Sequence, residues 1–139
     1  MPQNLRFLLS FIFLSLIILS IFNLSILDNK ILIKNKIINQ TPITIFEPEK
    51  DKKNKNLIFI AHGFAGSSSF MKSIALSLAN TGYKTVTFDF LGHGRHSQAY
   101  SGNILDEKGA TKLFVKQTEN LIDYFLDKKT GYKAIIIGH

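Results

Sequence analysis

The N-terminal part of the chain is one long apolar segment, interrupted only by single serines and one asparagine. Residues 7–27 contain no charged side chain, and a helix of that length spans roughly 31 Å, close to the thickness of the hydrocarbon core of a bilayer. The serines recur every fifth residue, a spacing that distributes them around a helix and leaves no polar stripe. We therefore expect residues 7–27 to form a single N-terminal transmembrane anchor, preceded by a short tail of residues 1–6.

A cleaved signal peptide is the alternative interpretation of this segment, with Arg6 in its charged N-terminal region. The segment is long for a signal peptide, and no pair of small residues follows it at cleavage-site spacing, so the sequence favours an uncleaved anchor. The orientation stays open, because cations lie on both sides of the segment: Arg6 before it, and Lys30, Lys34 and Lys36 after it.

Beyond the apolar segment, short β-branched runs alternate with amphipathic stretches. Residues 28–56 contain two early strands and a lysine-rich loop, and residues 57–139 contain the rest of the domain. The runs at 57–61 and 134–137 are apolar without alternation, which is typical of strands covered on both faces, as in a parallel sheet. Strands are predicted over residues 31–38, 43–46, 57–61, 85–90 and 134–137.

Two helices are predicted between these strands. The first begins near the hydroxyl groups of residues 67–69, which we expect to act as N-caps, and Gly82 ends it. The second covers about residues 111–127, with Gly131 closing it. The residues expected to face the core are Phe70, Met71, Ile74, Ala75 and Leu78 in the first helix, and Phe114, Leu121, Ile122 and Phe125 in the second.

This order of strands and helices implies parallel strands joined by right-handed crossovers. In such sheets, ligands bind at the carboxyl ends of the strands. Three loops rich in glycine and histidine fall at those ends, namely residues 62–66, 92–96 and 138–139. The pattern therefore predicts that these loops converge at one edge of the sheet.

Taken together, these loops resemble three motifs of the α/β-hydrolase family, in the serine aminopeptidase and lysophospholipase branch. His62-Gly63 after a buried strand is similar to the oxyanion loop of that family, and residues 89–94 are similar to its Asp-x-x-Gly-His-Gly turn. Gly138 and His139 resemble the start of the Gly-x-Ser-x-Gly nucleophile elbow. Leu91 departs from the family pattern, because an arginine is common there, and this departure puts specific contacts of the turn in doubt.

The resemblance implies the N-terminal part of an α/β-hydrolase fold, with a mostly parallel sheet and flanking helices after the membrane helix. It also implies hydrolysis of a small ester, amide or similar acyl substrate by a serine nucleophile, without a cofactor. The backbone N–H of Phe64 would donate to the oxyanion, and His62 and Gly63 would shape its loop. The serine, the acid and the base are absent from these 139 residues, so we expect this chain to be inactive alone.

The composition argues against nucleic-acid binding, disulfide bonds and metal sites. The formal net charge is 17 − 10 = +7, but only Arg6 and Arg95 are arginines. No arginine-rich motif is present, so we expect no nucleic-acid partner. The chain has no cysteine, which excludes disulfides and thiolate-bound zinc. His93 and His96 have no carboxylate or thiol beside them in the sequence, and we expect no metal site there.

Two other functions remain as alternatives. The chain could be a non-catalytic, membrane-tethered module that binds a partner through an open sheet edge, because the apolar run at 134–137 would leave one edge unpaired. For the same reason we expect residues 28–139 alone to be poorly soluble. A nucleotide-binding doubly wound domain is less favoured, since no Gly-x-Gly-x-x-Gly motif follows the strand at 57–61. Asp89 is expected to hold the glycine turn at 92–94 through backbone N–H groups, and not to act as the catalytic acid.

Overall fold

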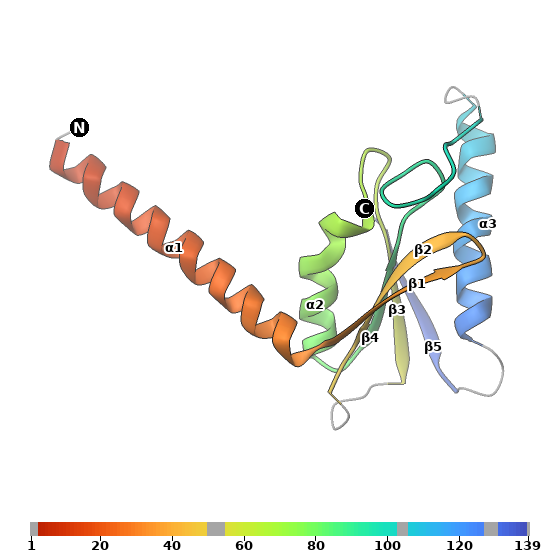
Figure 1. The fold of residues 1–139 in the computed structure, drawn as a ribbon, viewed down its shortest axis with the longest axis horizontal. Coiled ribbons are helices and arrows are strands. Elements are labelled where there is room, and N and C mark those ends of the chain that lie inside the picture. Colours follow the sequence, from red (N-terminus) through yellow and green to blue (C-terminus); the bar gives the residue numbers. More distant parts are fainter. Residues whose placement is uncertain (1–2, 50–54, 103–105, 127–130, 139) are drawn as a thin grey trace.

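The computed structural model describes residues 3–49, 55–102, 106–126 and 131–138. The chain begins with a long helix, continues as a β-hairpin, and then alternates between strands and helices (Figure 1). In order, the elements are α1 (Gln3–Lys30), β1 (Leu32–Ile38), β2 (Thr41–Glu47), β3 (Asn56–Ala61), the 3₁₀ helix η2 (Ser68–Met71), α2 (Lys72–Asn80), β4 (Lys84–Phe88), α3 (Glu107–Phe125) and β5 (Lys133–Gly138).

Five strands form one mixed sheet in the order β1-β2-β4-β3-β5. The pairs β3–β4 and β3–β5 are parallel, as the sequence predicts. The pairs β1–β2 and β2–β4 are antiparallel, so the sheet is less parallel than expected. The reason is the tight hairpin turn between β1 and β2, where Asn39 and Gln40 both have positive φ, at 47° and 68°.

The two faces of the sheet are covered by different helices, α2 on one face and α3 on the other (Figure 1). Alternate residues of each strand point to opposite faces, so each strand supplies both cores. Phe59 and Phe88 are fully buried on the α3 face, while Ile58 and Ile60 are buried on the α2 face. The sequence prediction that Leu121 faces the core is confirmed, because its side chain is 1% exposed.

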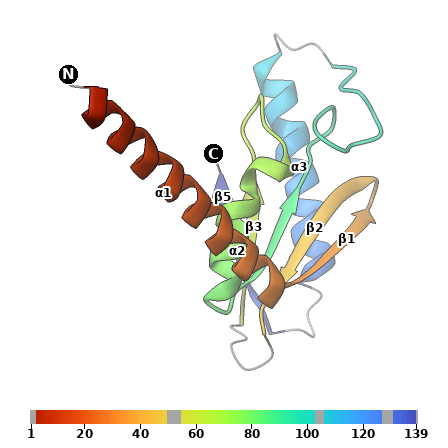
Figure 2. The same cartoon turned by 60° about the vertical axis from the view of Figure 1, so that its left-hand side comes forward.

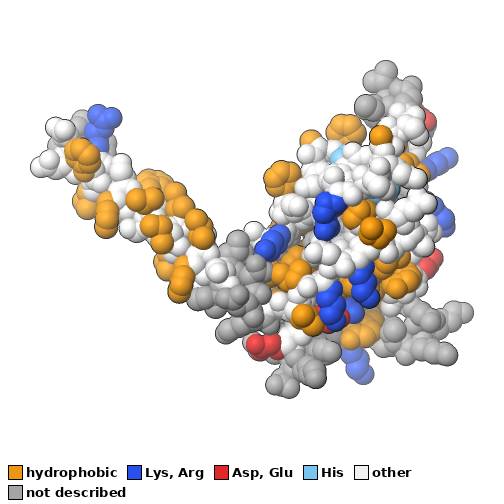
Figure 3. Space-filling model, in the orientation of Figure 1, with side chains coloured by type: hydrophobic (Ala, Val, Ile, Leu, Met, Phe, Trp, Pro, Cys, Tyr) orange, Lys and Arg blue, Asp and Glu red, His pale blue; other side chains and the backbone are white. Residues whose placement is uncertain are grey.

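Helix α1 projects away from the sheet domain (Figures 1 and 2). Its residues Gln3–Asn23 are long and apolar enough to cross a membrane, with a mean hydropathy of 2.5, and none of them is buried by the rest of the chain. Apolar side chains cover its visible surface (Figure 3). The hydroxyl of Ser15 donates to the carbonyl of Phe11 at 2.9 Å, so this serine is satisfied within the helix.

The structure corrects two predictions about burial. In the first predicted helix, Met71 and Ala75 are buried as expected, but Phe70 and Ile74 are 72% and 45% exposed. The apolar arc of this helix is wider than the strip that the sheet can cover. The run at 134–137 was predicted to be buried and is half-exposed instead, because β5 is an edge strand of the described sheet.

Several predicted helix boundaries also change. Helix α3 begins at Glu107, four residues earlier than predicted, because Asp106 caps it by accepting a hydrogen bond from the N–H of Gly109. Helix α3 ends at Phe125, so Gly131 is not its closing residue. The predicted end at residue 127 lies outside the described residues. Ser67 precedes η2 without a side-chain cap. Gly82 does end α2, with a φ of 101°.

Candidate active site

The carboxyl ends of β3, β4 and β5 meet at one edge of the sheet, as the sequence predicts from the order of the elements. The parallel register pairs Ala61 of β3 with Gly138 of β5. The loop that begins at His62 therefore starts beside the end of the strand that leads to the predicted nucleophile elbow. His139 lies outside the described residues. The convergence of these loops follows from topology alone.

His62 is a structural part of its loop and is 3% exposed. Its Nε2 accepts a hydrogen bond from the backbone N–H of Phe90 at 3.2 Å, and its Nδ1 lies 2.8 Å from the carbonyl oxygen of Gly63. Both contacts are satisfied by the neutral ring that carries its hydrogen on Nδ1. The same carbonyl of Gly63 accepts from the N–H of Gly66 at 2.9 Å, which closes a tight turn.

Phe64 is the first central residue of this turn, in the loop after β3. Its side chain is 70% exposed, and its carbonyl oxygen contacts Nε2 of His93. The other ring nitrogen of His93 lies 3.0 Å from the carbonyl oxygen of Leu91. His93 therefore ties the loop after β3 to the loop after β4, and both of its nitrogens face carbonyl oxygens. Within the part of the chain that the structure describes, the N–H of Phe64 has no hydrogen-bond acceptor.

Asp89 anchors the loop after β4 from inside the protein, where it is fully buried. Its Oδ1 accepts from the N–H of Ser68 at 2.6 Å, and its Oδ2 accepts from the backbone N–H and from Nε of Arg95 at 3.3 and 3.1 Å. Burial by itself raises the pKa of Asp89, but the hydrogen bonds from Ser68 and Arg95 outweigh it and lower the pKa below the ordinary value.

These contacts extend the expected role of Asp89. The sequence predicts that it holds the turn at 92–94 through backbone N–H groups, and it accepts from the N–H of Arg95, directly after Gly94. Its bonds with the N–H of Ser68 and with Nε of Arg95 were not predicted. The turn is also shaped by close approach. Gly94 has a φ of 52°, and an added Cβ there would collide with the carboxylate of Asp89.

Arg95 connects the loop after β4 to the β1–β2 hairpin at the edge of the sheet. Its guanidinium donates to Oδ1 of Asn35 at 3.1 Å, to the hydroxyl of Thr44 at 3.0 Å and to the hydroxyl of Ser68 at 3.2 Å. The sequence analysis assigned no contact to Arg95. The only signal available was its rarity, because 15 of the 17 cations are lysines and Arg95 is the single arginine beyond the apolar segment.

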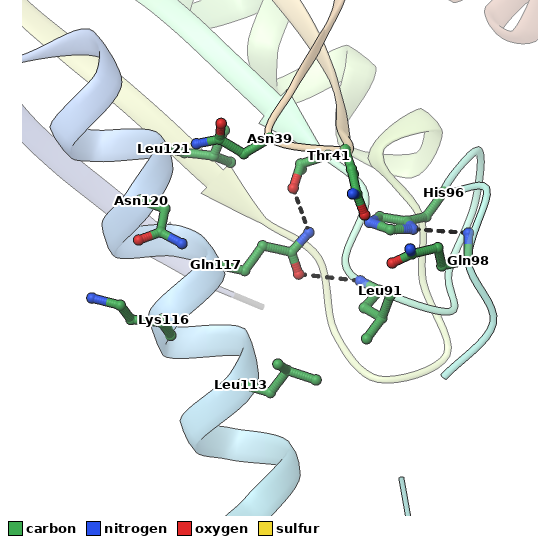
Figure 4. A pocket seen from close by; sticks show the side chains of 11 residues that line it. Asn39, Thr41, Leu91, His96, Gln98, Leu113, Lys116, Gln117, Asn120 and Leu121 are labelled. Atoms are coloured by element: carbon green, nitrogen blue, oxygen red, sulfur yellow. Dashed lines mark hydrogen bonds between the residues drawn. The ribbon is translucent and has the colours of Figure 1, made fainter. Parts of the chain in front are cut away.

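Gln117 of α3 is the second functional-site residue that sequence reasoning missed. Its amide nitrogen donates to the hydroxyl of Thr41 at 2.8 Å and to the carbonyl of Asp89 at 3.2 Å, and its oxygen accepts from the N–H of Leu91 at 3.1 Å. Figure 4 shows Gln117 reaching from the helix to Thr41 and to Leu91. Gln117 lines a pocket of about 190 Å³ between α3 and the β1–β2 turn.

Comparison with solved structures shows the same fold. The chain is similar to TT1662 from Thermus thermophilus (TM-score 0.62, 16% identity, 78% of this chain and 46% of that one). It is also similar to a lipase in its open form (TM-score 0.60, 16% identity, 78% and 36%). A third match is an alpha-beta serine hydrolase homologue from Coxiella burnetii (TM-score 0.57, 18% identity, 76% and 50%).

The chain thus spans half or less of the length of these three structures. No curated protein sequence matches it significantly. The family model for serine aminopeptidase, S33, matches residues 52–139, which is more than half of the chain. This match covers β3, β4 and β5 and the loops that follow β3 and β4. The chain belongs to the serine aminopeptidase S33 family and has an α/β-hydrolase fold.

Proposed function

We propose that the chain is the N-terminal portion of a membrane-anchored serine hydrolase that cleaves a small ester, amide or similar acyl substrate. The observation that carries the proposal is the backbone N–H of Phe64, which has no acceptor among the described residues and lies at the carboxyl edge of the sheet. Acyl transfer places negative charge on the substrate carbonyl oxygen, and one such N–H donor is commonly worth about 3 kcal/mol of transition-state stabilisation.

The surroundings of Phe64 support this role. A donor contributes most when its position is fixed before the reaction. The turn at Gly63 and the contact between the Phe64 carbonyl and His93 hold the backbone on both sides of this N–H. The buried ring of His62 stabilises the turn by bonding to the carbonyl of Gly63 and to the N–H of Phe90. In this proposal His62 and Gly63 are positioning residues, and no cofactor takes part.

The nucleophile is proposed to follow Gly138 and His139, beside the end of β3. The 139 residues contain no Gly-x-Ser-x-Gly sequence, and a serine needs both a histidine base and an acid to attack an acyl carbon. We therefore expect these 139 residues alone to hydrolyse no p-nitrophenyl ester above a protein-free control. Helix α1 would hold the enzyme in the membrane, on the strength of its length and apolar surface.

The first test is the native coding sequence after the codon for His139. The proposal expects Ser-x-Gly there, followed later by an Asp or Glu and a His. A stop codon in that place would contradict a hydrolase and favour the non-catalytic tethered module.

The second test addresses Phe64 in that longer enzyme. Phe64→Pro removes the N–H, and we expect kcat to fall by about 10²–10³. Phe64→Ala removes the ring but keeps the N–H, and should retain most of kcat. Equal losses in both variants, with unchanged circular dichroism, would show that the N–H does not bind the oxyanion.

A further inference from the structure

Two exposed apolar side chains, Phe70 of η2 and Ile74 of α2, form a stripe that is not used by the core of the domain. Leu78 lies four residues after Ile74, on the same side of α2, and packs partly against the core. Phe70 is 72% exposed, Ile74 is 45% exposed, and Leu78 is partly buried. The neighbouring side of the helix, with Ala75, Leu76 and Ala79, already fills the contact with the sheet.

Helix α2, which carries Ile74, covers the face of the sheet on which α1 is attached. Helix α1 contacts α2 directly. In both views, α2 is the helix of the sheet domain nearest to α1, and the two helices diverge from their junction (Figures 1 and 2). The first residue after α1, Ile31, is 6% exposed and packs in the core with Phe46. No linker therefore separates α1 from the folded domain.

The length of α1 sets the distance between the domain and the bilayer. The apolar part, Gln3–Asn23, has 21 residues, enough for the hydrocarbon core. The remaining residues, 24–30, add roughly 10 Å of helix at 1.5 Å per residue. The polar region on each side of a bilayer is only about 5–8 Å thick. With α1 across the membrane, the domain begins at the membrane surface.

The chemistry of α2 suits a lipid surface. The helix has the sequence KSIALSLAN, in which Lys72 is the only charged residue and no acid is present. A helix without an acidic side chain is not repelled by lipid phosphates. Figure 3 shows lysine or arginine side chains on this part of the domain, near the end of α1.

We propose that the stripe of Phe70 and Ile74 rests in the surface of the bilayer that α1 crosses, as a second membrane contact. This inference rests on the membrane anchor of the proposed function. The contact fixes the orientation of the domain relative to the bilayer, because a single spanning helix can tilt and a second contact restrains that tilt. The 3₁₀ helix that carries Phe70 follows the loop of Phe64 in the chain, so the sheet edge with the candidate site is held close to the lipid surface.

The absence of tryptophan from the sequence allows a direct test. The full chain is reconstituted into phosphatidylcholine vesicles with and without brominated acyl chains, in three variants with one tryptophan each. Phe70→Trp reports on the stripe. Phe13→Trp reports on the membrane span. Tyr124→Trp is the matched control, because Tyr124 is 56% exposed on α3, on the opposite face of the sheet.

The proposal expects brominated lipid to quench Phe70→Trp and Phe13→Trp, both with blue-shifted emission, and to leave Tyr124→Trp unchanged. If Phe13→Trp is not quenched, the membrane anchor itself is wrong. If Phe13→Trp is quenched but Phe70→Trp behaves like Tyr124→Trp, the anchor stands and the second contact is overturned. Blue-shifted emission from Phe70→Trp without quenching would mean that protein covers the stripe, which also overturns the proposal.

Discussion

The Nε of Arg95 donates to Oδ2 of Asp89 at 3.1 Å, and this pair joins a fully buried carboxylate to a side chain that is 43% exposed. Asp89 directly follows the central strand β4. Arg95 donates from there to Asn35 and Thr44 of the β1–β2 hairpin. Through Asp89 and Arg95 the loop after β4 is held to three segments of the chain: β1, β2 and η2. That connection keeps the carboxyl edge of the sheet in place around the candidate site.

Asp89→Asn should destabilise the fold by about 2–4 kcal/mol, because the buried carboxylate loses its charge-assisted hydrogen bonds from Ser68 and Arg95 and an amide nitrogen then faces other donors. Urea unfolding of the full chain in detergent micelles, followed by circular dichroism, measures this change. Asp106→Asn is the control, since Asp106 is exposed at the cap of α3 and asparagine caps helices well. Equal stability of the two variants would contradict the role of Asp89.

The same carboxylate makes stability depend on pH. The folded-state pKa of Asp89 is lowered from its ordinary value of 3.8, so its contribution is present above that value and is lost as the pH falls through the folded pKa. We expect the free energy of unfolding to fall below about pH 4 and to fall less in Asp89→Asn. Glu47→Gln is a second test, because hydrogen bonds from Lys34 and Lys84 outweigh partial burial and lower the pKa of Glu47 as well, so this variant should also lose part of the slope. A wild-type slope retained in Asp89→Asn would assign the acid sensitivity to other groups.

Gly94→Ala should cost more stability than Gly131→Ala. Both glycines have positive φ, at 52° and 63°, so each alanine pays about 1 kcal/mol for its backbone conformation. At Gly94 the new methyl group also collides with the carboxylate of Asp89, whereas at Gly131 no atom of the described residues lies within 4 Å of the added Cβ. The collision should add about 1–3 kcal/mol. Thermal unfolding of the two variants side by side measures the difference, and similar melting temperatures would refute the close packing at Gly94.

Gln117→Met should destabilise the domain by about 1–3 kcal/mol, because it keeps the side-chain volume but leaves the N–H of Leu91 and the hydroxyl of Thr41 without this partner. Asn120→Leu is the comparison, since Asn120 is an exposed residue of the same pocket. Hydrogen exchange at the N–H of Leu91 gives a local readout. Faster exchange is expected only in Gln117→Met, and unchanged protection would exclude the hydrogen bond from Gln117.

The sequence correctly predicted most elements of this fold and the convergence of its loops. Apolar runs such as residues 57–61 identify strands covered on both faces, and the alternation with helices makes the later strands parallel. It did not show which side of α2 is buried, because Phe70, Met71, Ile74 and Ala75 all satisfy helical periodicity. Only the width of the sheet decides which of them are covered.

Some residues of the candidate site could likewise be identified from the sequence, and others could not. The motif residues His62, Gly63 and His93 stand out in the sequence because glycine and histidine follow strand ends, and the resemblance gave them their expected roles. The contacts of Arg95 with Asn35 and of Gln117 with Thr41 join residues 60 and 76 positions apart. No local pattern encodes such pairs, since they depend on where the sheet places each strand end.

By itself, the sequence determined the apolar N-terminal helix, the strand and helix segments, and the edge at which the glycine-rich loops meet, because these follow from local periodicity and chain order. Tertiary structure alone decided that Asp89 binds Arg95 and Ser68, and that Phe70 and Ile74 stay outside the core. These features arise from the packing of distant segments, where burial and hydrogen-bond geometry select among partners that the sequence leaves equivalent.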